Sequence, residues 1–251
     1  MWCFGLNCGR DLSLVLFYII IEFAAANPSS SRIECDELKP ECLKQTLQKA
    51  VPNFLKGRPE VGVEVLDPFY IDKLEMTLAG GLKIKFTNGH AKGLRKCIVE
   101  KARVMHDVIE TQFLCNLTVK GKYKSSGRLL MFPINGDGDA AIRCKNLRVN
   151  LTLQLRSIKG SGDTYLEIVN SQSKHSYEGQ IQYNLTNLIK GSPETSKTLL
   201  NFMNQNWHMV AQEFGDPLVD FGVKVILRNI KKLISAVPMN QLFTTWEPVP
   251  A

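Results

Sequence analysis

Cysteines are the residues of this chain whose types and spacing suggest chemistry most directly. Cys35 and Cys42 lie close together, and Cys97, Cys115 and Cys144 follow further on. A short loop favours closure, so we predict a disulfide between Cys35 and Cys42 in an oxidising compartment. Cys3 and Cys8 belong to a predicted signal peptide, residues 1–26, so these five cysteines remain in the mature part. Because five is odd, at least one thiol stays unpaired or pairs between chains. The spacing leaves open which of the last three that is.

The other candidates for chemistry lack the partners that catalysis or metal binding would need. Residues 135–139 resemble the start of a calcium loop, but an EF-hand has glycine at position six and glutamate at position twelve. This chain has Ala140 and Asn146 there, so a glycine-rich hairpin turn is favoured. No C-x-x-C pair, nucleophile elbow, phosphate loop or dinucleotide fingerprint occurs. We therefore predict that the protein is not an enzyme and uses no metal or cofactor.

Three N-glycosylation sequons begin at Asn116, Asn150 and Asn184. Each asparagine falls on the polar side of a segment in which apolar and polar residues alternate. A bulky glycan can be accommodated on such a side. We therefore predict a sheet with an outer face that can carry sugar and an inner face that must be covered.

The alternation itself predicts antiparallel strands with one covered and one wet face. Residues 147–155 are the clearest case, with leucine or valine at every second position. The same pattern is found, in shorter form, in residues 61–65, 82–86, 113–119 and 177–185.

Apolar residues at helical spacing predict helices before and after these strands. The first covers roughly residues 40–55 and ends near Gly57. Ser192-Pro193-Glu194 is a good helix start, with a serine cap, proline in the first turn and an early acid. Gly215 can end that helix, and Asp216-Pro217 can start another. Strands first and a long helix last predict an α+β fold, with the helix across one face of the sheet.

The N-terminal segment, residues 1–26, predicts a secretory signal peptide. The apolar run Leu12–Ile21 is shorter than the roughly 20 residues of a membrane-spanning helix. Glu22 interrupts it, which disfavours the alternative of a membrane anchor, and Ala24 and Ala26 are small residues suited to cleavage. The sequence therefore predicts an exported, extracellular protein.

The predicted mature part, residues 27–251, is expected to be a single domain and a monomer. The chain is 44% hydrophobic, which is enough for a sizeable core, and its net charge is +7. The basic residues are scattered and lack an aromatic stacking pattern, so we expect no nucleic-acid binding. A solvated basic surface that contacts a membrane or a receptor transiently is the alternative that the charge leaves open.

Several motifs, taken in order, resemble the insect takeout and juvenile-hormone-binding protein family. The clearest are Cys35…Cys42, Leu66-Asp67-Pro68, Gly127-Arg128-Leu129-Leu130, Pro133-Ile134-Asn135-Gly136-Asp137-Gly138 and the segment Leu199–Trp207. The resemblance implies a strongly curved antiparallel sheet wrapped around a long C-terminal helix, enclosing an apolar tunnel. It also implies that the tunnel holds terpenoid hormones, fatty-acid-like molecules or other lipids. No cysteine follows Cys144, so the late disulfide of the moth hormone carriers cannot form, and the chain looks like the takeout branch.

We therefore expect a secreted carrier of a small hydrophobic ligand. A signalling or membrane-docking protein with the same fold is the alternative. The candidate lining residues are the larger apolar side chains on faces expected to look inward: Phe54, Val65, Phe69, Phe113, Leu117, Val119, Leu151, Leu153, Ile181, Tyr183, Leu200, Met203, Trp207, Phe221 and Val225. Among them, Tyr183 also brings a hydroxyl that could orient the polar end of a ligand. For each of these residues, simple packing in a filled core is the alternative.

Overall fold

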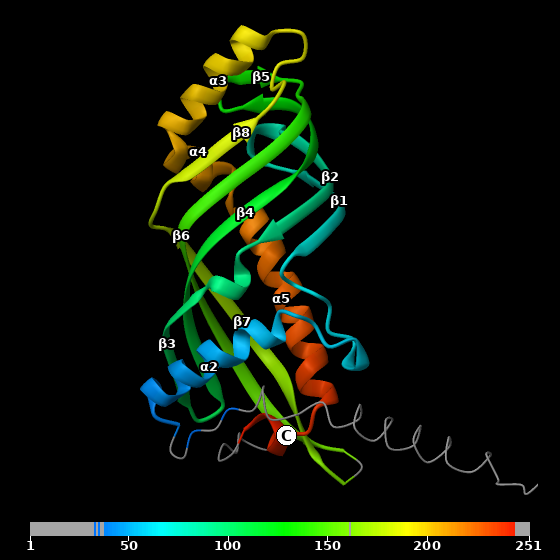
Figure 1. Ribbon diagram of the computed structural model, residues 1–251, viewed down its shortest axis with the longest axis vertical. Coiled ribbons are helices and arrows are strands. Elements are labelled where there is room, and N and C mark those ends of the chain that lie inside the picture. The colour runs from blue at the N-terminus through cyan, green and yellow to red at the C-terminus, as the bar shows by residue number, and fades with distance from the viewer. Residues whose placement is uncertain (1–32, 34, 36–37, 161, 244–251) are drawn as a thin grey trace, which may run out of the picture.

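The structure is a computed structural model that describes residues 33, 35, 38–160 and 162–243 (Figure 1). Within these residues a curved, eight-stranded antiparallel sheet wraps around the C-terminal helix α5 (Asp216–Ala236). This is the predicted α+β arrangement. The predicted signal peptide and its cleavage site lie outside the described residues.

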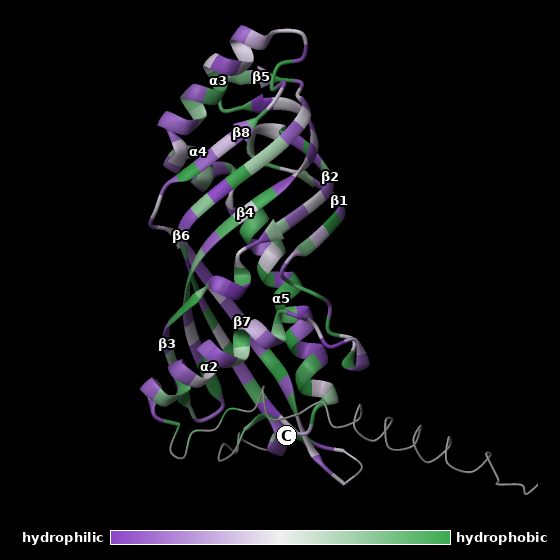
Figure 2. Cartoon of the chain, viewed as in Figure 1, coloured by the Kyte–Doolittle hydropathy of each residue, from purple (hydrophilic) through white to green (hydrophobic). Residues whose placement is uncertain are grey.

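The sheet is built on two very long strands, and its shorter strands pair with them. The path is β1-β2-β4-β6-β7, while β3 and β5 pair with β4, and β8 pairs with β6. The strands are β1 Phe69–Thr77, β2 Lys83–Lys92, β3 Ile98–Met105, β4 Val108–Leu129, β5 Phe132–Ile134, β6 Asp137–Lys159, β7 Thr164–Tyr177 and β8 Ile181–Leu185. Figure 2 shows hydrophobic and hydrophilic residues alternating along β4 and β6, as expected for strands with one covered face.

The helices lie at the two ends and along the inside of this sheet (Figure 1). Near one end α2 packs against β3, and towards the other end α3 and α4 pack against β8. Along the inside, α5 packs against β7. Besides α5 they are α2 Pro40–Phe54, α3 Pro193–Gln205, α4 Trp207–Phe214 and the short α6 Met239–Leu242, with single 3-10 turns η2 Pro59–Val61, η3 Ala79–Gly81 and η4 Leu94–Lys96. None of the described helices is long and apolar enough to span a membrane.

The C-terminal helical region contains one more break than the sequence predicts. Proline occupies the first turn of both α3 and α5, as expected from Pro193 and Pro217. The break at Gly215 is present, but a further one occurs at Asn206. There the side chain Nδ2 of Asn206 donates to the carbonyl of Phe202 at 2.9 Å. An asparagine side chain that competes for backbone groups in this way favours a helix end over helix interior.

A bulge in β6 decides which of its residues face inward. Between the pairs Cys115–Leu147 and Leu117–Cys144, β4 advances by two residues and β6 by three. Asn146, at the bulge, has a positive φ of 49°. One extra residue exchanges the two faces of a strand. Before the bulge the even-numbered residues of β6 face inward, and after it the odd-numbered ones do.

The segment 61–65 is not a strand, so that prediction was wrong. Its first residue, Val61, ends the turn η2, and Gly62 then has a φ of 72°. The backbone folds back so that Arg58 bridges Val63, which breaks the period of two. As a result Leu66 is buried, with 1% of its surface exposed, whereas Val65 is 47% exposed.

This loop is held to α5 by one buried side chain. Asn229 is 0% exposed. Its Oδ1 accepts a hydrogen bond from the backbone N–H of Glu64 at 2.9 Å, and its Nδ2 donates to the carbonyl of Val225 at 2.9 Å. A buried polar group that lacks its partner is costly, so the pairing requires an amide at this position.

Replacing Asn229 with alanine should therefore lower the free energy of unfolding by about 1–3 kcal/mol, because the N–H of Glu64 loses its acceptor. Urea unfolding followed by circular dichroism would measure this. Asn201→Ala, an exposed asparagine of α3, is the matched control and should shift the same free energy by about 0.5 kcal/mol or less. Equal losses in the two variants would contradict the role of Asn229.

Candidate functional site

The inner side of the sheet and the helices that cover it bring most of the predicted lining residues together. The upper part of this interior lies between β1, β2, β4, β6 and β8 and the helices α3 and α4. Eight predicted residues belong to it or pack against it: Phe69, Val119, Ile181, Tyr183, Leu200, Met203, Trp207 and Phe221.

The lower part of the interior is formed mainly by β6, β7 and the second half of α5. Leu151 and Leu153 pack there with Leu166 and Ile234. Phe113 lies nearby, against a cluster that α2 and β3 form around Leu43. Leu117 pairs with Cys144, whose side chain packs against the upper core, so it faces the same side.

Phe54 and Val225 belong to a small cluster between the two parts, with Leu55 and Leu66. Phe69 and Phe221 contact both this cluster and the upper core. Their ring centroids are 6.2 Å apart, within the range of an aromatic pair. These two rings therefore join the upper interior to the middle of the molecule.

Val65 is the one predicted lining residue that the fold turns away from this interior. Its side chain is exposed on the loop before β1, and the neighbouring Leu66 is buried in its place. The strand expected at this position does not form, so alternation could not predict which side chain turns inward.

The inward-facing apolar side chains differ in how completely they are covered. Leu151, Leu153, Ile181, Met203 and Val225 are buried. A second group is only partly buried, although its members contact the core or pair with residues that do: Phe54, Phe69, Phe113, Leu117, Val119, Leu200, Trp207 and Phe221. A closely packed core covers such side chains almost completely. The second group is therefore the apolar surface that a ligand could contact.

A polar group lies within the upper part of the interior. The side chain of Tyr183 is buried, and its hydroxyl has no hydrogen-bond partner among the described residues. Burial and the nearby Cys144 raise the pKa of this hydroxyl, so it stays neutral. A buried hydroxyl without a partner requires an explanation, and a ligand's polar end is one.

Neighbouring tyrosines, by contrast, have partners. The hydroxyl of Tyr177 donates to Asp216 Oδ1 at 3.1 Å, and His175 Nε2 is 2.9 Å from the same oxygen. The hydroxyl of Tyr123 donates to the carbonyl of Thr186 at 2.8 Å. Burial, and then the charge of Asp137, raises the pKa of Tyr123 to about 12. Tyr183 is thus the tyrosine of this group that is free to contact a ligand.

Cys144 is the cysteine without a disulfide partner among the described residues, and it faces this interior. Burial raises the pKa of its thiol from 9.0 to about 11. The thiolate is the reactive form, and a shift of this size lowers its fraction near neutral pH by on the order of 100-fold.

Iodoacetamide should accordingly label Cys144 in the folded protein on the order of 100-fold more slowly than in urea at pH 7.5. The rate in the folded protein should keep rising with pH up to about 11, because the raised pKa delays ionisation. Mass spectrometry of timed samples measures this. A rate in the folded protein that levels off near pH 9 would contradict it.

The remaining described cysteines form two disulfides. The predicted bond between Cys35 and Cys42 is present, with Cα atoms 5.8 Å apart. Cys97 and Cys115 form the second, with Cα atoms 4.4 Å apart. The sequence left this second pairing open, because the two residues meet only when β3 folds back on β4.

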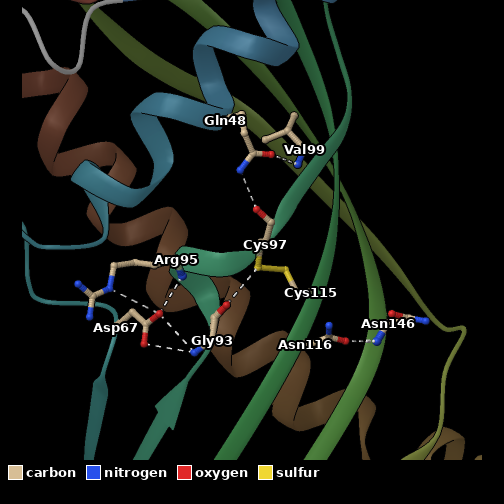
Figure 3. Close-up of a disulfide and its surroundings, with 9 residues drawn as sticks. All are labelled: Gln48, Asp67, Gly93, Arg95, Cys97, Val99, Cys115, Asn116 and Asn146. Carbon is tan, nitrogen blue, oxygen red and sulfur yellow. Dashed lines mark hydrogen bonds and ion pairs between the residues drawn. A yellow bond between two sulfur atoms is a disulfide. The ribbon is translucent and has the colours of Figure 1, made fainter.

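Figure 3 shows that polar contacts around this second disulfide tie α2 to the sheet. Gln48 of α2 donates through Nε2 to the carbonyl of Cys97 at 3.0 Å and accepts the N–H of Val99 at 2.7 Å. The buried carboxylate of Asp67 accepts the backbone N–H groups of Gly93 at 3.2 Å and Arg95 at 2.8 Å. Sequence reasoning missed both side chains, although Asp67 lies in a motif that carried the resemblance. The wall of the interior is therefore braced here from α2 through β3 to β1.

The three sequon asparagines all lie on the polar, outer side of the sheet. Asn116 and Asn184 are exposed, and Asn150 is partly buried. The Oδ1 atom of Asn116 accepts the N–H of Asn146 at 2.8 Å, and that of Asn150 accepts Gln112 Nε2 at 2.7 Å. Both contacts use the side-chain oxygen of the asparagine. The side-chain nitrogen, where a glycan would be attached, takes part in neither contact.

The glycine-rich segment 135–139 is a turn that leads from β5 into β6. Its acids face lysines of β4, with Lys124 Nζ 3.1 Å from Asp137 and Lys122 Nζ 3.8 Å from Asp139. Within the described ranges no three His, Cys, Asp or Glu side chains are placed to hold a metal ion.

A curved sheet wrapped around a helix, with apolar side chains lining its inner side, defines the class of protein: it has the fold of carriers of hydrophobic ligands. Comparison with known proteins agrees. The sequence model described as haemolymph juvenile hormone binding protein (JHBP) matches residues 13–244. The chain belongs to this juvenile-hormone-binding and takeout family.

Individual similar proteins support the same conclusion. The circadian clock-controlled protein daywake of Drosophila yakuba and that of Drosophila melanogaster are each 25% identical over 223 residues, covering 83% of this chain and 85% of each relative. The crystal structure of Epiphyas postvittana Takeout 1 superposes with a TM-score of 0.80 at 32% identity. That match covers 85% of this chain and 100% of the other.

Proposed function

We propose that this protein is a secreted, single-domain carrier, residues 27–251, that holds one small hydrophobic ligand in an elongated tunnel between the sheet and α5. Terpenoid, fatty-acid-like and other lipid molecules are the ligand classes considered. Membership of a family of hydrophobic-ligand carriers supports the carrier role, and the two disulfides of the described residues support export, because disulfides form and persist in oxidising compartments.

One observation carries the proposal. Apolar side chains from β1, β4, α2, α3, α4 and α5 face inward yet remain only partly buried, and the unpartnered hydroxyl of Tyr183 lies among them. Apolar surface buried on binding contributes roughly 25 cal/mol per Å². Enclosing a few hundred Å² would supply several kcal/mol before entropic costs, which is enough for micromolar or tighter binding. No step of this function needs a catalytic group.

Native mass spectrometry of the secreted protein tests the proposal. We expect the measured mass to exceed that of the polypeptide and its glycans. This excess mass should disappear after extraction with organic solvent. The extract should then contain a lipid. A protein that carries no lipid, and that takes none up when a terpenoid or a fatty acid is added, would rule out the carrier function.

Trp207 provides an independent readout of binding. It is partly buried and packs against the upper core, so a ligand beside it changes its surroundings. Adding a terpenoid or fatty-acid probe should shift its fluorescence emission in a saturable manner. In Trp207→Phe the saturable change should vanish while uptake measured by mass spectrometry remains. A saturable change that persists in this variant would place the bound probe elsewhere.

A secreted interaction protein with the same fold is the second candidate, because the chain has a net charge of +7 and unpaired basic side chains on its outer face. A soluble protein with no lipid cargo that binds a receptor-bearing cell surface would favour it. In either case we expect a monomer, and sugar on some of Asn116, Asn150 and Asn184.

A further inference from the structure

The outer face of the sheet, opposite the proposed ligand tunnel, carries a hollow of about 230 Å³ across three strands. Residues of β4, β6 and β8 line it: Lys120, Ala141, Arg143, Gln182 and Asn184, together with Tyr183, whose side chain is buried in the core on the inner side of the sheet. Lys120 pairs with Ala141, which in turn pairs with Asn184, so these three form one row. Ala141 has the shortest side chain of that row, and the longer side chains around it form the rim.

The two cations on this rim are not neutralised by the protein. Lys120 and Arg143 are exposed, and neither forms an ion pair with a carboxylate of the described residues. On β2, His90 pairs with Lys120, and Lys92 lies opposite Thr118 next to Arg143. Lys92 extends the same unpaired positive surface.

The next lysines along β4 differ, although they lie on the same face. Lys122 and Lys124 are each within ion-pair distance of an aspartate of β6, at 3.8 and 3.1 Å. Their charge is therefore largely cancelled locally. Of these three β4 lysines, Lys120 at the hollow is thus the one without an ion-pair partner among the described residues.

The amide side chains on the opposite rim complete a set of hydrogen-bond donors. Neither Gln182 nor Asn184 has a side-chain hydrogen bond within the part of the chain that the structure describes. Carboxamide N–H₂ groups donate to oxyanions, lysine supplies a point charge, and arginine binds phosphate oxygens in a bidentate manner. Two cations and two amides around one hollow match a ligand with several oxygens and a negative charge.

We propose that this hollow is a binding site for a phosphate group, supplied either by free phosphate or by the head group of an acidic phospholipid. The site lies on the outer face and does not rest on the proposed carrier function. Asn184 is both a rim residue and the start of a sequon, so a glycan there would cover the hollow. Phosphate binding therefore requires Asn184 to be unmodified.

The test uses the full-length secreted protein with Asn184→Gln, which keeps the carboxamide and prevents glycosylation. Inorganic phosphate is titrated at constant ionic strength and followed by amide chemical shifts, because salt alone screens charge. Vesicles of phosphatidylcholine with and without phosphatidic acid are tested by sedimentation. We expect phosphate to shift the amides of residues 141–143 and 182–184 in a saturable manner. Vesicle binding that depends on phosphatidic acid and is displaced by phosphate would identify the lipid source, and phosphate binding alone would identify the soluble one.

A matched pair of double variants tests the residues. Lys120→Gln with Arg143→Gln should weaken binding of phosphate or phosphatidic acid at least tenfold. Lys122→Gln with Lys124→Gln removes the same amount of charge from the same face. This variant should change the affinity for phosphate or phosphatidic acid less than twofold. Equal losses in both, or no saturable shift at the hollow, would overturn the site. Uptake of a hydrophobic probe should be unchanged in both double variants, so the carrier function is judged separately.

Discussion

Phe221→Glu is expected to lower the affinity for a hydrophobic probe by about 100-fold while the protein stays folded. Phe221 lies on α5, faces inward, pairs with Phe69 and is only partly buried. Water can still reach a carboxylate there in the empty protein, whereas a bound lipid would remove it. Burying an ionised carboxylate against apolar surface costs several kcal/mol, and each 1.4 kcal/mol is a factor of ten in affinity.

The control for this variant is Leu218→Glu, which places the same charge one turn earlier on the same helix. Leu218 is 39% exposed and belongs to none of the described core clusters. Its replacement should change the dissociation constant less than twofold in a fluorescence titration. Similar losses of affinity in both variants would contradict an internal site that passes Phe221.

More deeply placed lining residues are less suitable for such a test. Leu153 and Val225 are 7% and 6% exposed and pack in separate clusters. A charge at either position would be buried even without a ligand, so it would unfold the protein as well as prevent binding. Loss of uptake there could not be assigned to the ligand.

Removing the second disulfide is the change expected to affect stability most. Cys97→Ser with Cys115→Ser should lower the free energy of unfolding by about 3 kcal/mol, the value that chain entropy predicts for a loop of this length. The same region holds Gln48 and Asp67, so α2 should also detach more easily. Urea unfolding and hydrogen exchange of α2 amides would measure the two effects.

Cys144→Ala is the control, because it also removes a thiol but opens no disulfide loop. It should cost about 1 kcal/mol, the usual size of a modest core truncation. If the double serine variant were no less stable than Cys144→Ala, the disulfide would not be what braces this wall of the interior.

Much of the fold follows from the sequence, because strands and helices depend on neighbours a few positions apart. The alternation in residues 147–155 predicts the covered face of β6 after its bulge, and Pro193 and Gly215 mark helix ends that the structure contains. The Cys35–Cys42 disulfide is predictable for the same reason, since its loop is short.

The candidate site follows from the sequence only where the strand phase is regular. Val119 and Tyr183 lie in parts of their strands where inward-facing and outward-facing residues alternate regularly, and both face the upper core. Alternation could not separate buried from partly buried inward residues. That difference depends on how much space the helices leave, which no local pattern records.

Where residues far apart in the chain must meet, the tertiary structure alone decided the outcome. The bulge at Asn146 exchanges the inward face of β6, Cys97 finds Cys115 only when β3 folds back on β4, and Asp67 finds its N–H partners on η4. In the loop before β1, the contact of Asn229 with Glu64 accompanies a backbone in which Leu66 turns inward and Val65 does not. Sequence by itself determined the periodic elements, since their residues interact over short separations. Pairing, register and the exposed apolar surface of the interior depend on contacts across the whole fold, so they were decided by tertiary structure.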